Sequence, residues 1–154
     1  MESDHHDVAI LWYNIATLHL EVGADDLAIK HYCETLRIER MTLGCKHPDV
    51  VLTLQHLGLV HQQRRELEEA LIYFGEALEI ENQKERRNQQ AAAKLLNLIG
   101  NIHLQRANVC EMMACYSEAS RIYREHVQPH DNLVIAGYDF YGLSKMHPPS
   151  APAA

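Results

Sequence analysis

The sequence predicts an all-α protein made of about three and a half stacked helical hairpins. Two observations support this fold class: an internal repeat with a step of 42 residues, and two amphipathic helical segments within each repeat. With 154 residues, 47% of them hydrophobic, and only 7 Gly and 5 Pro, the chain can bury the core of one domain. A disordered or low-complexity chain is excluded by the same composition.

The repeat consists of similar residues that recur in one register without an insertion. Seven such series are Trp12, Leu54, Leu96 and Tyr138; Ile15, Leu57, Ile99 and Tyr141; Ala16, Gly58, Gly100 and Gly142; His19, His61 and His103; Tyr32, Phe74 and Tyr116; Thr35, Ala77 and Ala119; and Ile38, Ile80 and Ile122. Their common step indicates an internal duplication.

Each unit contains two helical patterns separated by a short break. In the first unit, Trp12, Ala16 and His19 lie on one face of a helix, and a second helical pattern follows the break at Gly23. A break this short requires the two helices to be antiparallel. We therefore expect helices at about Asp7–Val22, Asp25–Met41, Pro48–Arg64, Leu67–Lys84, Gln89–Arg106 and Val109–Glu125.

These helices divide the chain into units of about 7–48, 49–90 and 91–131. A half unit, 132–146, is expected to hold a seventh helix at about Asn132–Lys145 that caps the stack and mediates self-association. The proline-rich tail, 147–154, is expected to be disordered.

A small residue in the first helix and a large ring in the second helix recur in every unit. The small residues are Ala16, Gly58 and Gly100, and the rings are Tyr32, Phe74 and Tyr116. A larger side chain at the small position would hold the paired helices apart. We therefore expect each ring to fill the space beside its small residue.

The spacing of Trp12, Ala16, Gly23, Ala28 and Tyr32 resembles the tetratricopeptide repeat. The second unit matches through Leu57, Gly58, Ala70, Phe74 and Ala77, and the third through Gly100, Tyr116 and Ala119, with Met112 where a small residue is usual. The departure at Met112 predicts looser packing in the third hairpin. The resemblance implies a right-handed superhelical α-solenoid whose inner surface is formed by the first helix of each unit.

The 42-residue unit, with Leu43-Gly44 and His47-Pro48-Asp49-Val50 at the joins, resembles the kinesin light chain subgroup of these repeats. That resemblance implies an adaptor that holds peptides or protein segments in a concave groove. Because the chain has no heptad segment, we expect a free-standing repeat protein rather than a motor subunit.

The expected inner stripe is rich in side chains that both donate and accept hydrogen bonds, which suits binding to a peptide backbone. The candidate partner-binding residues are Tyr13, Asn14, Thr17, Gln55, His56, Gln63, Lys94, Asn97, Asn101 and Gln105. Leu52, Leu59 and Leu98 in the same stripe are expected to be exposed, which favours binding. The alternative is that the stripe is only a solvated set of helix faces. With Lys94 as its one cation, the stripe does not favour a receptor for chaperone C-terminal carboxylates.

Other chemistry is not favoured by the sequence. The net charge of −7 disfavours nucleic acids and anionic membranes as partners. The sequence shows no catalytic or phosphate-binding motif, so we expect no enzymatic activity and no cofactor. His19, His61 and His103 are interpreted as packed, hydrogen-bonded rings rather than metal ligands, and Cys110 and Cys115 point in different directions on one helix. Unpaired cysteines and an acidic first segment predict a cytoplasmic protein.

The second functional hypothesis is structural. In it the chain is a building block of a larger multiprotein assembly, joined to its neighbours by end-to-end stacking of helices. A hairpin stack needs polar caps to stay soluble alone. An uncovered apolar end would therefore favour this alternative.

Overall fold

The computed structural model describes residues 2–84 and 88–126 of the chain, and side chains from residue 5 onward. This part of the chain contains six α-helices and no strand. The helices are α1 (Glu2–Glu21), α2 (Asp25–Thr42), α3 (Pro48–Gln63), α4 (Leu67–Asn82), α5 (Gln89–Gln105) and α6 (Val109–His126). The predicted fold class is therefore confirmed.

The six helices begin and end close to the predicted positions, with one difference at the start of the chain. Helix α1 begins at Glu2 rather than at Asp7, so His5 and His6 lie within the helix. The predicted seventh helix, Asn132–Lys145, and the predicted disordered tail, 147–154, lie outside the described residues.

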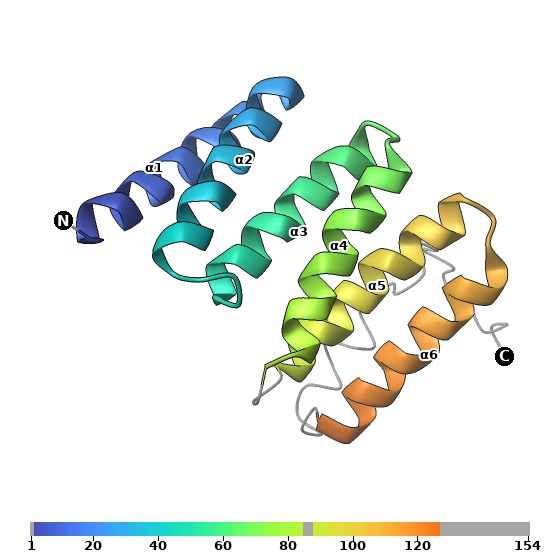
Figure 1. Ribbon diagram of the computed structural model, residues 1–154. Coiled ribbons are helices and arrows are strands. Elements are labelled where there is room, and N and C mark those ends of the chain that lie inside the picture. Colours follow the sequence, from blue (N-terminus) through green and yellow to red (C-terminus); the bar gives the residue numbers. More distant parts are fainter. Residues whose placement is uncertain (1, 85–87, 127–154) are drawn as a thin grey trace, which may run out of the picture.

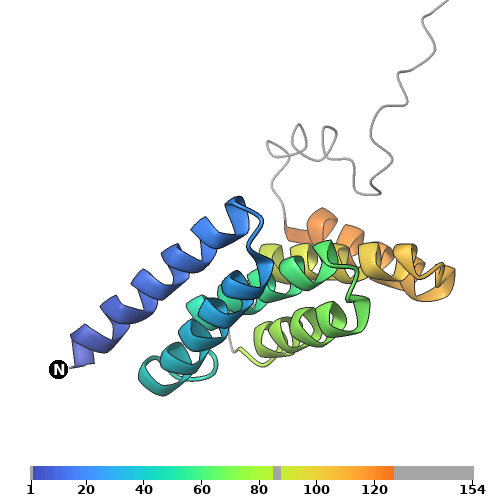
Figure 2. The same ribbon diagram turned by 90° about the horizontal axis from the view of Figure 1, so that it is seen from above.

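The helices form three antiparallel hairpins, α1–α2, α3–α4 and α5–α6, which stack in chain order (Figure 1). Each hairpin contacts the next mainly through its second helix, so that α2 packs on α3 and α4 packs on α5. Seen from above, the stack extends from α1 at one edge to α6 at the other (Figure 2). Helices α1 and α6 are thus the two ends of the described array.

The three hairpin turns share one backbone geometry at the 42-residue step. Gly23, Arg65 and Ala107 have positive φ angles of 76°, 65° and 57°. The next residue in each turn donates its N–H to a carbonyl five residues earlier: Ala24 to His19 at 2.8 Å, Glu66 to His61 at 2.9 Å, and Asn108 to His103 at 2.9 Å. This is the left-handed helix cap for which glycine is preferred. Only the first turn has a glycine there, so the sequence marks this cap by a glycine only at Gly23.

Close approach of the paired helices explains the small residues of the repeat. A Cβ atom added at Gly58 would lie 2.5 Å from Cε1 of Phe74, and one at Gly100 would lie 2.7 Å from Cε1 of Tyr116. The Phe74 ring is fully buried, and Tyr116 is 4% exposed. The predicted pairing of small residue and ring is confirmed in both hairpins.

Ion pairs between successive hairpins follow the same register. Arg64, the residue that follows α3, pairs with Asp26 at the start of α2. Arg106, at the end of α5, pairs with Glu68 at the start of α4 at 2.8 Å. Both pairs are solvent-exposed, so each stabilises the stack by at most about 1 kcal/mol. Most of the stacking energy therefore comes from the apolar contacts between hairpins.

Candidate protein-interaction surface

Three of the predicted binding residues meet where α1, α2 and α3 join. The Tyr13 hydroxyl lies 3.3 Å from both ring nitrogens of His56, and Thr17 Oγ1 lies 3.0 Å from the Tyr32 hydroxyl. The Tyr13, Tyr32 and His56 ring centroids are 5.3–5.5 Å apart. Burial, followed by nearby Tyr32, raises the pKa of Tyr13 to about 12, so its hydroxyl keeps its proton at neutral pH. These side chains form a polar cluster across the first two hairpins, in which the hydroxyl groups and the imidazole hydrogen-bond mainly to one another.

Asn101 has a comparable internal role in the third hairpin. Its Oδ1 accepts a 2.5 Å hydrogen bond from the Tyr116 hydroxyl, in the same register as the Thr17–Tyr32 pair. In the middle unit, the corresponding residues are Leu59 and Phe74, both in the apolar core. A polar residue on the first helix therefore occurs where the ring of the second helix has a hydroxyl. Sequence reasoning missed this role, although the covariation of the two positions among the units could have revealed it.

The structure changes the interpretation of several predicted surface residues. Gln55 is only 6% exposed, so its side chain belongs to the hairpin interior rather than to an open surface. Leu59 and Leu98 are half-buried and pack against the core, whereas Leu52 is 42% exposed. The expectation of three exposed leucines is therefore correct only for Leu52.

The remaining predicted residues are accessible or partly so. Asn14, Gln63 and Lys94 are exposed. Gln105 is also exposed, and its Oε1 accepts a 3.3 Å hydrogen bond from the guanidinium of Arg65. Asn97 is half-buried, and its Oδ1 has no hydrogen-bond partner within residues 2–84 and 88–126.

Two rows of exposed side chains run across the first helices at the repeat step. One row is Ile10, Leu52 and Lys94, and the other is Glu21, Gln63 and Gln105. Within each helix, the two positions are eleven residues apart, which is close to three helical turns, so both rows lie on one face. We call the surface between and including these rows the inner face. Tyr13, Thr17, His56, Asn97 and Asn101 are half-buried side chains of the same helices.

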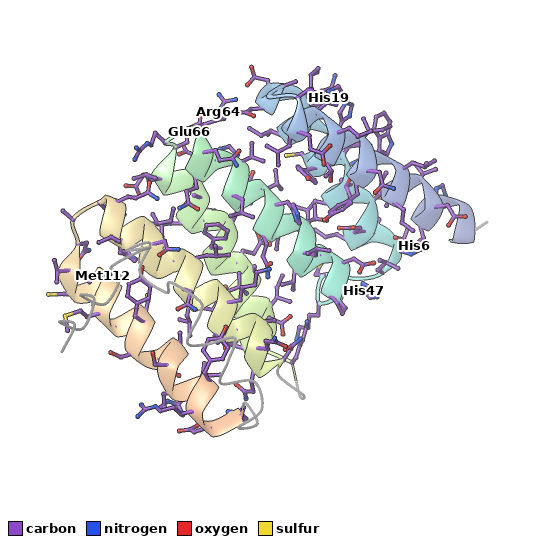
Figure 3. The ribbon with its side chains drawn as sticks, turned by 180° about the vertical axis from the view of Figure 1, so that it is seen from behind. His6, His19, His47, Arg64, Glu66 and Met112 are labelled. Atoms are coloured by element: carbon purple, nitrogen blue, oxygen red, sulfur yellow. The ribbon has the colours of Figure 1, made fainter. Side chains whose placement is uncertain are left out.

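The recurring histidines are packed, but they are not equally hydrogen-bonded. His61 Nδ1 lies 2.6 Å from Glu66 Oε2, and its ring stacks on Tyr73 with centroids 5.2 Å apart. This hydrogen bond, together with the nearby Arg64, lowers the pKa of Glu66. Arg64 and Glu66 lie at the turn between α3 and α4 (Figure 3). His19 stacks on His31 instead, and His103 Nδ1 is buried without a hydrogen-bond partner among the described residues.

The six described helices contain neither a cluster of possible metal ligands nor an apolar stretch of membrane-spanning length. No group of three or more His, Cys, Asp or Glu side chains there could hold a metal ion. None of these helices is both long and apolar enough to cross a bilayer.

Met112, the departure in the third unit, is half-buried at the start of α6 (Figure 3). It lines an open hollow of about 460 Å³ together with Met113, Tyr116, Ser117, Ser120 and Arg124. Loose packing of the third hairpin stays a prediction.

Stacked antiparallel hairpins with a fixed step define the class of helical repeat proteins. The sequence profile of the tetratricopeptide repeat matches residues 3–83, and the chain belongs to the tetratricopeptide repeat family. This repeat is a non-catalytic module that generally mediates protein–protein interaction or scaffolding.

A solved structure, that of BtubC (BKLC) from P. vanneervenii, is similar to this chain with a TM-score of 0.70 and 20% sequence identity. The match covers 96% of this chain and 52% of BtubC, so the chain spans about half the length of that protein. At this identity, the likeness shows the fold alone. No curated protein sequence matches the chain.

Proposed function

We propose that the chain is an adaptor that binds a peptide or protein segment along the inner face of α1, α3 and α5. The observation that carries the proposal is the row formed by Ile10, Leu52 and Lys94. Ile10 is 45% exposed and Leu52 is 42% exposed, on a surface otherwise rich in polar side chains. Exposed apolar side chains that recur at the repeat step on the first helices of successive units would gain from burial under a ligand.

The chemistry of the two rows suggests what the ligand carries. Ile10 and Leu52 would contact apolar side chains, and Lys94 would attract a carboxylate at the end of the same row. Gln63 and Gln105 could donate to and accept from the ligand backbone. A segment with apolar residues followed by an acidic one would fit both rows.

Several finer properties belong to the same proposal. The repeats would be of the kinesin light chain-like kind, without enzymatic activity or a cofactor, and the protein would act in the cytoplasm. All four cysteines are free thiols, which agrees with a reducing compartment. Self-association through the predicted C-terminal helix, at about Asn132–Lys145, also stays a proposal, since that segment lies outside the described residues.

The test begins with a pull-down and mass spectrometry to identify a partner, followed by calorimetry on the purified pair. The double variant Leu52→Asn/Lys94→Gln should weaken binding by about tenfold or more, equivalent to about 1.4 kcal/mol. Asn101 is not a suitable target, because its Oδ1 accepts a hydrogen bond from the Tyr116 hydroxyl inside the third hairpin. Ile72→Gln is the matched control, because Ile72 is 66% exposed on α4, outside the inner face.

Binding that survives the double variant but is lost in the Ile72 control would refute the inner face as the site. Circular dichroism of each variant should show unchanged helix content, since all three side chains are exposed. A partner lost only together with the helical signal would report unfolding and would not support the proposal.

A further inference from the structure

Helix α1 carries a continuous apolar stripe that faces away from its own hairpin. The stripe consists of Val8, Leu11, Ile15, Leu18 and Val22, with exposed fractions of 39%, 61%, 38%, 61% and 77%. Spacings of three and four residues place the first four side chains on one face of α1. Val22, which directly follows the helix, continues that face. We call this set the edge stripe.

The corresponding residues of the next unit are buried. Val50, Thr53, Leu57 and Val60 lie 42 residues after the first four members of the edge stripe, and each is fully buried on α3. On α5, the equivalent Ala92, Leu95 and Ile102 are fully buried as well.

What covers these residues follows from a comparison of α1 with α3. Ala16 on α1 and Gly58 on α3 are both buried, because each helix packs on the second helix of its own hairpin. Of these two helices, only α3 also packs on a preceding helix, α2. The residues buried on α3 but exposed on α1 are therefore those that a preceding helix would cover. The edge stripe is a helix-stacking face of the same kind as the α2–α3 and α4–α5 interfaces.

The charges around the edge stripe restrict the covering helix. Residues 1–29 contain no Lys or Arg. Their acidic residues are Glu2, Asp4, Asp7, Glu21, Asp25 and Asp26, of which Asp26 is paired with Arg64 of the next hairpin. A second α1 helix would bring the same acidic set against this one, and an anionic membrane surface has the same sign. A helix with Lys or Arg beside its apolar face has the complementary charge.

One interior contact refines the requirement further. On α3, the buried Thr53 lies next to the buried carboxyl of Glu39 of α2, and neither Thr53 Oγ1 nor Glu39 Oε2 has a hydrogen-bond partner among the described residues. The residue equivalent to Thr53 on α1 is Leu11, whose side chain has no polar group. The covering helix should therefore be apolar where α2 has Glu39.

We propose that the edge stripe of α1 docks a basic amphipathic α-helix from a partner protein, packed as α2 packs on α3. This inference does not rest on the inner face. It specifies the second hypothesis, in which the chain joins a larger assembly by end-to-end stacking of helices, and it gives the surface and the chemistry of the partner.

The test uses two synthetic peptides of residues 25–42, the segment that covers the equivalent face of α3. Both carry Glu39→Leu, and one also carries Asp25→Lys, Asp26→Lys and Glu34→Lys. Fluorescence anisotropy of labelled peptides, titrated with the full chain, measures binding. We expect the lysine peptide to bind about tenfold or more tightly than its acidic counterpart at low salt, with a difference that shrinks as salt is added.

Two protein variants locate the site. Leu11→Gln/Leu18→Gln removes the apolar centre of the edge stripe without adding charge, and should weaken the lysine peptide by about tenfold or more. Both leucines are 61% exposed, so the fold loses little buried area, and the single variants serve if the double variant shows reduced helicity. Ile72→Gln and the inner-face variant Leu52→Asn/Lys94→Gln should bind the peptide as the wild type does.

Unchanged binding in the Leu11→Gln/Leu18→Gln variant would overturn the proposal, as would equal binding of the two peptides. Sedimentation that shows a wild-type dimer separated by the same substitutions would assign the stripe to a second copy instead. Stripe-dependent binding to vesicles of phosphatidylcholine with phosphatidylglycerol would assign it to a membrane. A failure of the inner-face experiment alone would leave this result intact, because the variants are separate.

Discussion

Substitution of Gly58 by alanine tests the packing that defines the repeat. The added Cβ would lie 2.5, 2.7 and 2.8 Å from Cε1, Cδ1 and Cζ of Phe74. Carbon atoms in good contact are about 3.5–4.0 Å apart, so the ring would have to move by roughly 1 Å. Phe74 is fully buried, so in a close-packed interior its ring can move only by displacing neighbouring side chains.

The expected magnitude is a balance of two effects. Overpacking of this kind costs about 1–3 kcal/mol. Alanine is the better helix former by about 1 kcal/mol, which offsets part of the loss. We expect Gly58→Ala to lower the free energy of unfolding by roughly 1–2 kcal/mol and Gly58→Leu to lower it further. Gly100→Ala should cost less, because its nearest approach to Tyr116 is 2.7 Å.

Gly75 on α4 provides the matched control. A Cβ there meets nothing within 4 Å, so Gly75→Ala should raise the free energy of unfolding by about 0.5–1 kcal/mol through helix propensity alone. Urea unfolding followed by circular dichroism and by fluorescence of Trp12, the single tryptophan, measures each variant. The reasoning is refuted if Gly58→Ala stabilises the protein as much as Gly75→Ala does. Phe74→Leu should recover part of the loss in the Gly58→Ala background, because it removes ring atoms from the clash.

Two further predictions concern the turns and a buried carboxyl. Ala107 and Gly23 both have positive φ, which favours glycine. Ala107→Gly should therefore raise the free energy of unfolding by about 0.5–1 kcal/mol, and Gly23→Ala should lower it by a similar amount. A lower melting temperature for Ala107→Gly would contradict this. Burial raises the pKa of Glu39 above its usual 4.5, so the folded state disfavours the ionised form and loses stability as pH rises through the folded-state pKa. Glu39→Gln should therefore gain stability relative to wild type from pH 4 to pH 8 in urea unfolding, and a constant difference between the two would show that Glu39 does not titrate in that range.

The sequence by itself determined the elements and their pairing. Helical periodicity and the 42-residue step can both be read along the chain without knowledge of its contacts. They located α2 to α6 closely and predicted that Gly58 and Gly100 face large rings. They missed the start of α1 at Glu2, because residues 2–6 contain no apolar residue whose spacing could indicate a helix. The predicted helix bounds left Arg65 and Ala107 in the turns, but their positive φ angles were not predicted, because neither is the glycine that usually marks a left-handed cap.

The tertiary structure decided which side chains are available to a partner. Gln55 matches the polar pattern of the inner face but is buried, and the polar groups of Thr17 and Asn101 bind tyrosine hydroxyls of their own hairpins. The edge stripe shows the same limit, since Leu11 on α1 and Leu95 on α5 are equivalent leucines with exposed fractions of 61% and 0%. Exposure in a stacked array depends on whether another hairpin lies alongside. That neighbour is more than a helix away in sequence, so no local pattern reports it.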